Sequence, residues 1–275
     1  VYLWQTAVSD EGLAEWKQAH PEVAVQQEAD REVFGTAALN PPLLEAASTL
    51  FHDSIVVRAV SNFKGVQVHY TLNGTPPGPD SPLFPDSLIL RETAEVQALA
   101  TKSGWNESEV ASARFVKAGL RAKAGRLLNL PSGKYQAQGG ASLIDLQKGT
   151  EVFTAGNWLG YEGEHMGAVI ELPEATPLSE VTISALSRPA SWIFFPKGAA
   201  ISVSTDGQRF REVARVNWPT VDKEVAEAEL KYFPIEFEAV EARYVKVEVR
   251  SPLRNPDWHP NPGGKSWIFL DEILL

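Results

Sequence analysis

Short segments in which apolar and polar residues alternate recur along this chain from Leu43 onward. Residues 66–71 read Val-Gln-Val-His-Tyr-Thr, and residues 242–249 read Ala-Arg-Tyr-Val-Lys-Val-Glu-Val. Alternation with a period of two places successive side chains on opposite faces of an extended strand. Turn-forming sequences such as Asn73-Gly74 separate the segments. The pattern predicts an all-β fold built from short antiparallel strands.

A different composition precedes the strands. Residues 9–31 are rich in Glu, Gln and Ala and contain few apolar side chains. We expect one short helix that begins near Ser9 and ends before Pro21, followed by irregular chain up to Pro42. A lone helix of this length is unstable in water, so it either docks on the next domain or is the end of a preceding one. Residues 1–42 are interpreted as an N-terminal helical and irregular segment.

Composition narrows the class of protein. The 275 residues leave room for two domains, and 35 acidic against 25 basic residues give a formal charge of −10. Such a charge disfavours nucleic acid as a partner, and no apolar run is long enough for a membrane span. The absence of cysteine excludes thiol catalysis and disulfides, and fits an exported bacterial protein as well as a cytosolic one. Because the chain starts at Val1, we expect a mature form or a piece of a longer protein.

Residues 43–118 carry a first family resemblance. Residues 70–77 (Tyr-Thr-Leu-Asn-Gly-Thr-Pro-Pro), 93–98 (Thr-Ala-Glu-Val-Gln-Ala) and 104–108 (Gly-Trp-Asn-Glu-Ser) lie in strands and turns of this segment. Together they resemble the immunoglobulin/fibronectin-like module at the C-terminus of chitobiases and hexosaminidases, which usually has Asp where Asn73 stands. The resemblance implies a supporting β-sandwich without chemistry of its own.

Residues 127–275 carry a second resemblance. It rests on six segments in this order: residues 143–145 (Leu-Ile-Asp), 158–160 (Trp-Leu-Gly), 169–172 (Val-Ile-Glu-Leu), 203–207 (Val-Ser-Thr-Asp-Gly), 242–247 (Ala-Arg-Tyr-Val-Lys-Val) and 267–273 (Trp-Ile-Phe-Leu-Asp-Glu-Ile). Together they resemble the discoidin or coagulation-factor type C domain. Domains of this family are eight-stranded jelly rolls, and bacterial members include family 32 carbohydrate-binding modules, so the resemblance implies a jelly roll here.

Aromatic residues concentrate in Pro- and Gly-rich loops of this second domain. The sequence Ser-Trp-Ile-Phe occurs twice, at 191–194 and 266–269, and the second copy follows a stiff loop at 255–265. A sugar ring offers a flat apolar face with polar edges, which an aromatic ring and nearby hydrogen-bonding groups can bind. Trp267 is assigned to the core, and Trp158 is left open between packing and binding. By position, the resemblance implies these carbohydrate-binding residues: Trp158, Tyr161, Trp192, Trp258, His259 and Asn261.

The same resemblance implies one structural calcium ion. Family members hold it between the first loop and the last strand with oxygen ligands, which suit calcium. The matching positions here are Asp145, Thr150 and Glu272. The sequence departs from the family at Leu146, where Gly is usual, and Lys148 adds a positive charge nearby.

No catalytic motif stands out. The sequence has no Gly-rich phosphate loop, no Gly-x-Ser-x-Gly and no His-Glu-x-x-His, and its histidines lack metal-ligand spacing. We therefore expect no enzymatic activity. The interpretation is a carbohydrate-binding ancillary region of a secreted, periplasmic or cell-surface bacterial protein, which tethers a catalytic or anchoring domain of the same protein to a glycan. The alternative is a structural or adhesion module that contacts other proteins or braces a glycoside hydrolase.

Overall fold

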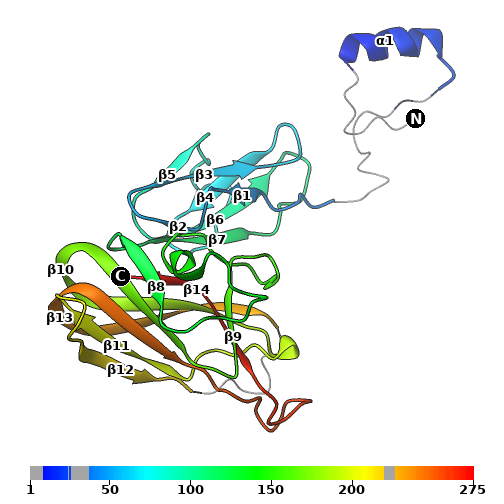
Figure 1. Ribbon diagram of the computed structural model, residues 1–275. Helices are drawn as coiled ribbons and strands as arrows, with labels where there is room; N and C mark the ends of the chain where they lie inside the picture. Colours follow the sequence, from blue (N-terminus) through cyan, green and yellow to red (C-terminus); the bar gives the residue numbers. More distant parts are fainter. Residues whose placement is uncertain (1–8, 24, 26–36, 220–226) are drawn as a thin grey trace. The chain divides into compact units, whose positions relative to one another are not determined.

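The computed structural model describes residues 9–23, 25, 37–219 and 227–275 (Figure 1). The chain divides into two compact units. One consists of Val1–Ala46, Val56–Ile89 and Ala94–Arg114, and the other of Ala47–Ile55, Leu90–Thr93 and Phe115–Leu275. No helix in the described part of the chain is long and apolar enough to cross a membrane.

The helix predicted near the N-terminus is confirmed as α1 (Asp10–Ala19). The Ser9 hydroxyl accepts a hydrogen bond from the backbone N–H of Gly12 at 3.2 Å and caps the helix. The helix ends before Pro21, as expected from the missing N–H of proline. Much of the irregular stretch predicted to follow, residues 24 and 26–36, lies outside the described residues.

Two small sheets come from residues 43–117, as the period-two pattern predicted. Val57 and Val96 are fully buried in them. Asn73-Gly74 forms the predicted turn, with Gly74 at a φ of 73° that favours glycine. The three-stranded sheet has the order β1 (Leu43–Glu45), β3 (Ile55–Val60), β5 (Leu88–Leu90), and the four-stranded sheet has the order β2 (Leu50–Phe51), β7 (Ala111–Lys117), β6 (Ala94–Thr101), β4 (Gln67–Thr71).

The remaining strands form one large sheet. Two short 3-10 helices, η1 (Gly139–Leu143) and η2 (Pro189–Ser191), lie in its connections. The sheet has the order β12 (Arg211–Asn217), β11 (Gly198–Ser204), β13 (Glu229–Arg250), β10 (Met166–Ser187), β14 (Trp267–Leu274), β9 (Leu159–Glu162), and β8 (Ala124–Leu127) also pairs with β10.

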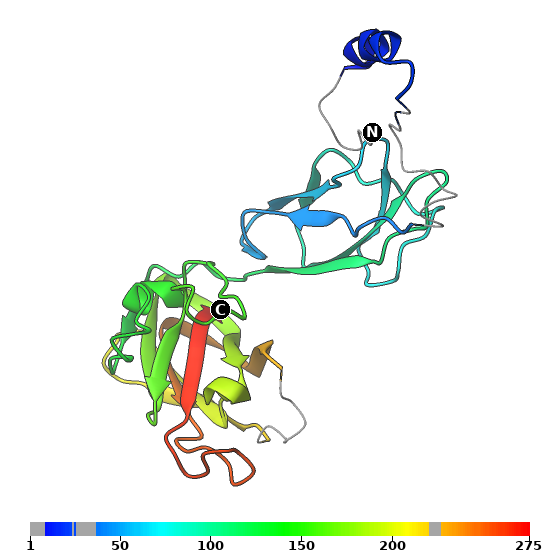
Figure 2. The same ribbon diagram turned by 90° about the vertical axis from the view of Figure 1, so that its right-hand side faces the viewer.

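Strands β10 and β13 run through both layers of this sheet. The first layer holds residues 166–172 and 242–250 of these strands with β8, β11 and β12, and the second holds residues 180–187 and 229–236 with β9 and β14. Each is 22 residues long, and their pairing shifts register between Glu171 and Thr176 and again between Leu178 and Glu180. Such irregularities bend a sheet without ending its strands, and Figure 2 shows the curvature. We expected separate strands at 168–172 and 180–184, and at 235–238 and 242–249. The structure corrects this, because bulges stand where turns were predicted.

The two layers enclose one hydrophobic core. Alternate residues of the first layer point inward, as do alternate residues of the second, and both sets belong to a single cluster. Burying each valine, isoleucine or leucine side chain of this cluster stabilises the fold by roughly 1.5–3 kcal/mol. The cluster includes Ala168, Ile170, Val245 and Val247 from the first layer and Val181, Ile183, Ile235 and Leu270 from the second. The all-β sandwich class expected from the sequence is confirmed.

Candidate carbohydrate-binding site

The two Ser-Trp-Ile-Phe copies lie side by side. The backbone N–H of Trp267 donates to the carbonyl of Trp192 at 2.8 Å, and the N–H of Phe194 donates to the carbonyl of Trp267 at 3.0 Å. Ile193 forms a parallel bridge with Trp267 and is buried. The pairing leaves Trp192 at the surface, with 43 % of its area exposed, while Trp267 packs partly buried against the core, as expected.

Trp192 has an unusual backbone conformation. It follows η2 with a φ of 64°, in the left-handed region that non-glycine residues avoid at a cost of roughly 1–2 kcal/mol. Two hydrogen bonds hold it there, one from its N–H to the carbonyl of Pro189 at 2.8 Å and one to its carbonyl from Trp267. Strained residues of this kind concentrate at functional sites. This one fixes the position of an exposed indole ring.

The 255–265 loop is tied to the same carbonyl through His259. The Nε2 of His259 lies 3.0 Å from the carbonyl oxygen of Pro189, and its Nδ1 accepts the backbone N–H of Asn261 at 3.1 Å. This pattern requires the neutral ring with its proton on Nε2. Because His259 is buried and both nitrogens are used within the protein, the prediction that it contacts a sugar is corrected. Its role is to join two loops.

Trp258 and Asn261 flank His259 in this loop. Trp258 is half-buried, with its ring edge-to-face against Phe194 at 6.0 Å, and Asn261 is exposed. The Asn255 side chain donates to the carbonyl of Asn261 at 3.0 Å and stiffens the loop. Figures 1 and 2 show the loop at the end of the strands away from the C-terminus. Trp192, Trp258 and Asn261 are thus on two loops that His259 joins, with polar and aromatic groups at the surface.

Trp158 and Tyr161 are core residues, which corrects their assignment to a sugar-binding surface. Each is only 1 % exposed. The indole N–H of Trp158 donates to the carbonyl of Thr150 at 3.0 Å, and the Tyr161 hydroxyl donates to the carbonyl of Asn129 at 3.3 Å. Burial, with a smaller contribution from Glu164, raises the pKa of Tyr161. Neither ring has a face open to a ligand.

Replacing Gly149 with alanine should destabilise the protein, because Gly149 lies against the Trp158 ring. A Cβ atom at position 149 would lie 2.4 Å from the Trp158 ring. The indole is too large to move aside in a packed core. We expect a loss of about 1–3 kcal/mol in the free energy of unfolding, measured by chemical denaturation. Gly133→Ala is the matched control, since nothing lies within 4 Å of its Cβ position. Equal losses in both variants would contradict the packing assigned to Trp158.

The residues predicted to hold calcium lie around a buried carboxyl group. Glu272 is fully buried, and neither of its carboxyl oxygens has a hydrogen-bond partner among the described residues. Burial raises the pKa of Glu272 to about 9, and the neighbouring carboxylates of Asp145 and Asp271 add to the shift. Leu146 takes a φ of 60°, so the loop makes a left-handed turn without the usual glycine. An orphaned buried carboxyl beside a second carboxylate fits a cation.

Thr150, predicted to be a calcium ligand, and Lys148, predicted to add positive charge near the ion, have other partners in the structure. Thr150 is exposed, and its carbonyl accepts the Trp158 indole N–H. The ammonium of Lys148 lies 2.5 Å from a carboxylate oxygen of Asp271 and 2.6 Å from the Ser184 hydroxyl. Lys148 therefore neutralises Asp271 and leaves Glu272 without an ion pair. Among the described residues, no three His, Cys, Asp or Glu side chains gather as a metal cluster.

Residues 46–112 match the family described as Chitobiase/beta-hexosaminidase C-terminal domain, as the first resemblance predicted. No curated protein matches the chain.

Several solved structures matching this chain are carbohydrate-binding modules. CpGH89CBM32-5 from Clostridium perfringens, in complex with GalNAc-beta-1,3-galactose, is 18 % identical over 56 % of this chain and 94 % of its own, with a TM-score of 0.35. CBM32-3 from a family 31 glycoside hydrolase of Clostridium perfringens is 16 % identical over 56 % of this chain and 89 % of its own, also with a TM-score of 0.35. The chitosan-binding module 1 of a chitosanase/glucanase from Paenibacillus sp. IK-5 is 15 % identical over 56 % of this chain and 94 % of its own, with a TM-score of 0.33.

Proposed function

We propose that residues 127–275 form a non-catalytic carbohydrate-binding module whose site lies on the two loops joined by His259. The observation that carries this proposal is the exposed indole of Trp192, which is held in a strained left-handed conformation by hydrogen bonds on both sides. Its face can stack on the C–H face of a sugar ring. Trp258 and Asn261 supply a second aromatic edge and a hydrogen-bonding amide for the hydroxyl groups.

We assign the whole chain an accessory role. The match of residues 46–112 to a module found at the C-terminus of chitobiases and hexosaminidases supports a region that accompanies other domains. In this role the chain tethers a catalytic or anchoring domain of the same bacterial protein to a glycan outside the cytoplasm. Tethering gains strength from effective concentration, so weak affinity at a single site is sufficient.

We also propose that Asp145 and Glu272 hold one structural calcium ion. The orphaned oxygens of Glu272 and the nearby Asp145 carboxylate support this assignment. The ion would join the loop after η1 to strand β14 and supply the positive charge that Glu272 lacks. No part of the proposed sugar binding depends on it.

A glycan-array screen of the full chain, followed by titration of the bound glycan, tests the carbohydrate-binding proposal. Trp192→Ala should weaken binding about tenfold or more, because stacking of an aromatic ring is lost. The thermal unfolding temperature should stay unchanged, since the indole is exposed. Trp16→Ala on α1 is the matched control, because Trp16 is similarly exposed at 38 % and lies outside the site. A folded chain that binds no glycan would instead favour the protein-contact alternative.

A further inference from the structure

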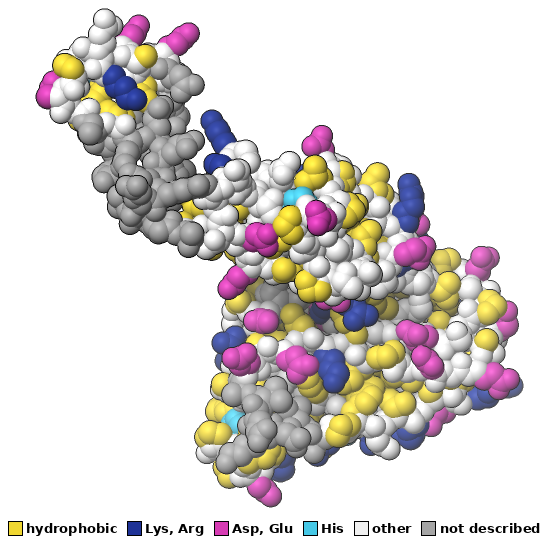
Figure 3. All heavy atoms as spheres, turned by 180° about the vertical axis from the view of Figure 1, so that it is seen from behind, with side chains coloured by type: hydrophobic (Ala, Val, Ile, Leu, Met, Phe, Trp, Pro, Cys, Tyr) yellow, Lys and Arg dark blue, Asp and Glu magenta, His cyan; other side chains and the backbone are white. Residues whose placement is uncertain are grey.

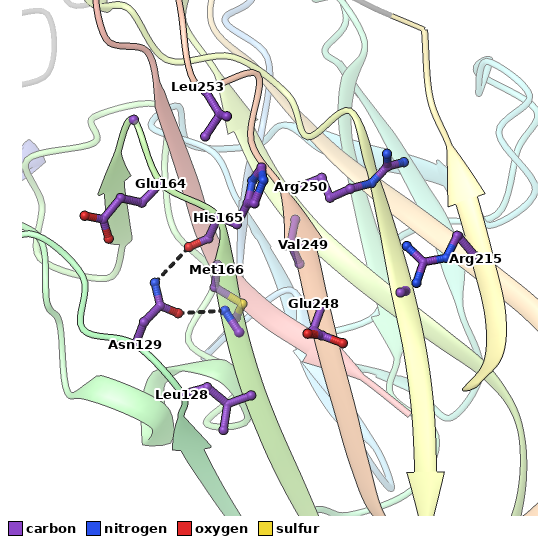
Figure 4. Close-up of a pocket in the computed structure, with 13 residues that line it drawn as sticks. Leu128, Asn129, Glu164, His165, Met166, Arg215, Glu248, Val249, Arg250 and Leu253 are labelled. Atoms are coloured by element: carbon purple, nitrogen blue, oxygen red, sulfur yellow. Dashed lines mark hydrogen bonds between the residues drawn. The ribbon is translucent and has the colours of Figure 1, made fainter. Parts of the chain in front are cut away.

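A groove on the outer face of the first layer is separate from the loops that carry Trp192 and Trp258. Four residues form a row across neighbouring strands: Gly167 on β10 pairs with Glu248 on β13, Glu248 with Ala200 on β11, and Ala200 with Arg215 on β12. Because paired residues point to the same side of a sheet, their side chains share the face turned away from the core. The outer-face groove lies over this row (Figure 4).

Small side chains create the hollow. Along β11, apolar Ala199, Ile201 and Val203 point into the core, and the alternate, outward residues are Gly198, Ala200, Ser202 and Ser204. All four outward residues are buried although they face away from the core, and Ala200 lines the groove together with Gly167 of β10. The groove has a volume of about 640 Å³, which is within the usual range of small-ligand sites.

The charges that line the outer-face groove are balanced. Figure 4 shows the guanidinium groups of Arg215 and Arg250 on one side and Glu164, His165 and Asn129 on the other. Arg215 forms a two-point ion pair with Glu212, and Glu248 pairs with Lys246 at 2.9 Å. Two lining guanidinium groups face two lining carboxylates, Glu164 and Glu248, so the formal charge of the groove cancels.

Arg250 keeps donors available for a ligand. Among the described residues, one nitrogen of its guanidinium, Nη2, donates to three neutral oxygens: the carbonyls of Val216 at 3.0 Å and Lys197 at 3.5 Å and the side-chain oxygen of Asn217. Within the described residues it forms no ion pair with an acidic side chain. Nδ1 of His165 accepts the backbone N–H of Ser251 at 3.1 Å, which leaves the Nε2–H of its neutral ring as a further donor.

Apolar side chains border the same space. Leu128 and Leu253 line the outer-face groove and are 45 % and 37 % exposed, so their apolar surface is accessible to a ligand there. Hydrophobic walls with a few convergent donors and acceptors characterise sites that bind small polar molecules. A saccharide matches both features, since its C–H faces contact leucine and each hydroxyl both donates and accepts.

We propose that the outer-face groove is a second carbohydrate site, which binds a neutral saccharide unit. Hydroxyl groups of the sugar accept from Arg250 and Arg215 and donate to Glu248, and its C–H groups contact Leu128 and Leu253. This inference takes from the proposed function only the class of ligand, a carbohydrate. The groove shares no residue with the loop site formed by Trp192, Trp258 and Asn261. Because the formal charges of the lining residues cancel, the groove offers no net positive charge for the carboxylate of a uronate. With two sites, a single module can contact two positions of one glycan.

Nuclear magnetic resonance titration of the isotope-labelled full chain separates the two sites. The probes are D-galactose and N-acetyl-D-galactosamine as neutral sugars, and D-glucuronate as the acidic one. The Trp192 indole N–H reports on the loop site, and the amides of Gly167 and Ala200 report on the outer-face groove. We expect the neutral sugars to shift the groove amides, and glucuronate to shift them at much higher concentration or not at all.

Two arginine variants of β12 complete the test. Arg215→Ala should raise the dissociation constant measured at the groove amides about tenfold, the effect of one charge-assisted hydrogen bond, and leave the Trp192 response unchanged. Arg211→Ala, on the same strand but outside the groove, should change neither response. Shifts confined to Trp192 would overturn the second site and keep the proposed function, whereas no shift at either place would overturn both. Tighter binding of glucuronate than of the neutral sugars would overturn the ligand class. An unchanged dissociation constant at the groove amides in Arg215→Ala would overturn the assignment of the groove.

Discussion

Replacing Lys148 with methionine should lower the free energy of unfolding by about 3–5 kcal/mol, the usual result of breaking a buried ion pair on one side. The Lys148 ammonium is the ionic partner of Asp271, whose side chain is fully buried. Without it, Asp271 keeps the backbone N–H groups of Gly149 and Glu272 but no opposite charge. The ammonium also lies 5.3 Å from the Trp158 ring and 5.4 Å from the Tyr232 ring, and these contacts are lost as well. Urea denaturation at neutral pH measures the loss.

Lys123→Met is the matched control for this prediction. Lys123 pairs with Glu171 at 2.8 Å, but its side chain is 55 % exposed, so water screens the pair and we expect Lys123→Met to change stability little. The double variant Lys148→Met/Asp271→Leu should recover part of the stability lost in Lys148→Met, because it removes the unpaired carboxylate. Similar losses in the free energy of unfolding for Lys148→Met and Lys123→Met would show that the buried pair stabilises the fold no more than the exposed one.

Raising the pH from 5 to 9 in the absence of calcium should destabilise the protein through Glu272. The folded pKa of Glu272 is about 9, against an ordinary value of 4.5. Between these values the folded state keeps a proton that the unfolded state releases, so the stability contributed by Glu272 is fully present below about pH 4.5 and is lost as pH rises toward 9. The slope contributed by one proton is at most about 1.4 kcal/mol per pH unit. Denaturation curves across this range measure it.

Calcium should oppose this loss if it binds at Asp145 and Glu272. Millimolar calcium should raise the unfolding temperature of the natural chain at pH 8, because the ion takes the place of the proton. Glu272→Gln should flatten the pH dependence and abolish the calcium effect. Glu171→Gln is the control, since hydrogen bonding to Lys123 lowers the pKa of Glu171 and moves its titration below this range. A pH dependence that calcium does not change would mean that the two carboxyl groups share a proton instead of an ion.

The sequence predicted the strands well but not how far they run. Period-two alternation and Asn73-Gly74 located the small sheets, and Ser9 and Pro21 bounded α1. The long strands β10 and β13 were each predicted as two strands. In β10 the reason is that Pro173 and the residues after it have the composition of a turn. In the structure they form a bulge that carries the chain from one layer to the other. Turns and bulges use the same residue types, so composition alone cannot separate them.

The candidate site was predicted in part. Alternation shows which residues share a face but not which face a distant loop covers. It therefore left undecided whether Trp158 is buried or binds sugar, whereas in the structure its indole N–H donates to the carbonyl of Thr150. The ring nitrogens of His259 bond backbone groups, one of them at Pro189, and no local pattern reveals such partners. The outer-face groove was missed. Its signal was present in residues 198–204, where small residues alternate with apolar ones in a strand otherwise suited to a core.

At position 192, backbone stability and the proposed binding function favour different residues. Glycine occupies the left-handed region without a steric penalty, so a glycine at this position relieves backbone strain while it removes the ring. A library of variants sorted only for heat resistance should therefore drift toward glycine at position 192. Retention of tryptophan there under such sorting requires a second, simultaneous demand for the surface that the ring provides. Stability alone therefore does not explain a tryptophan at position 192.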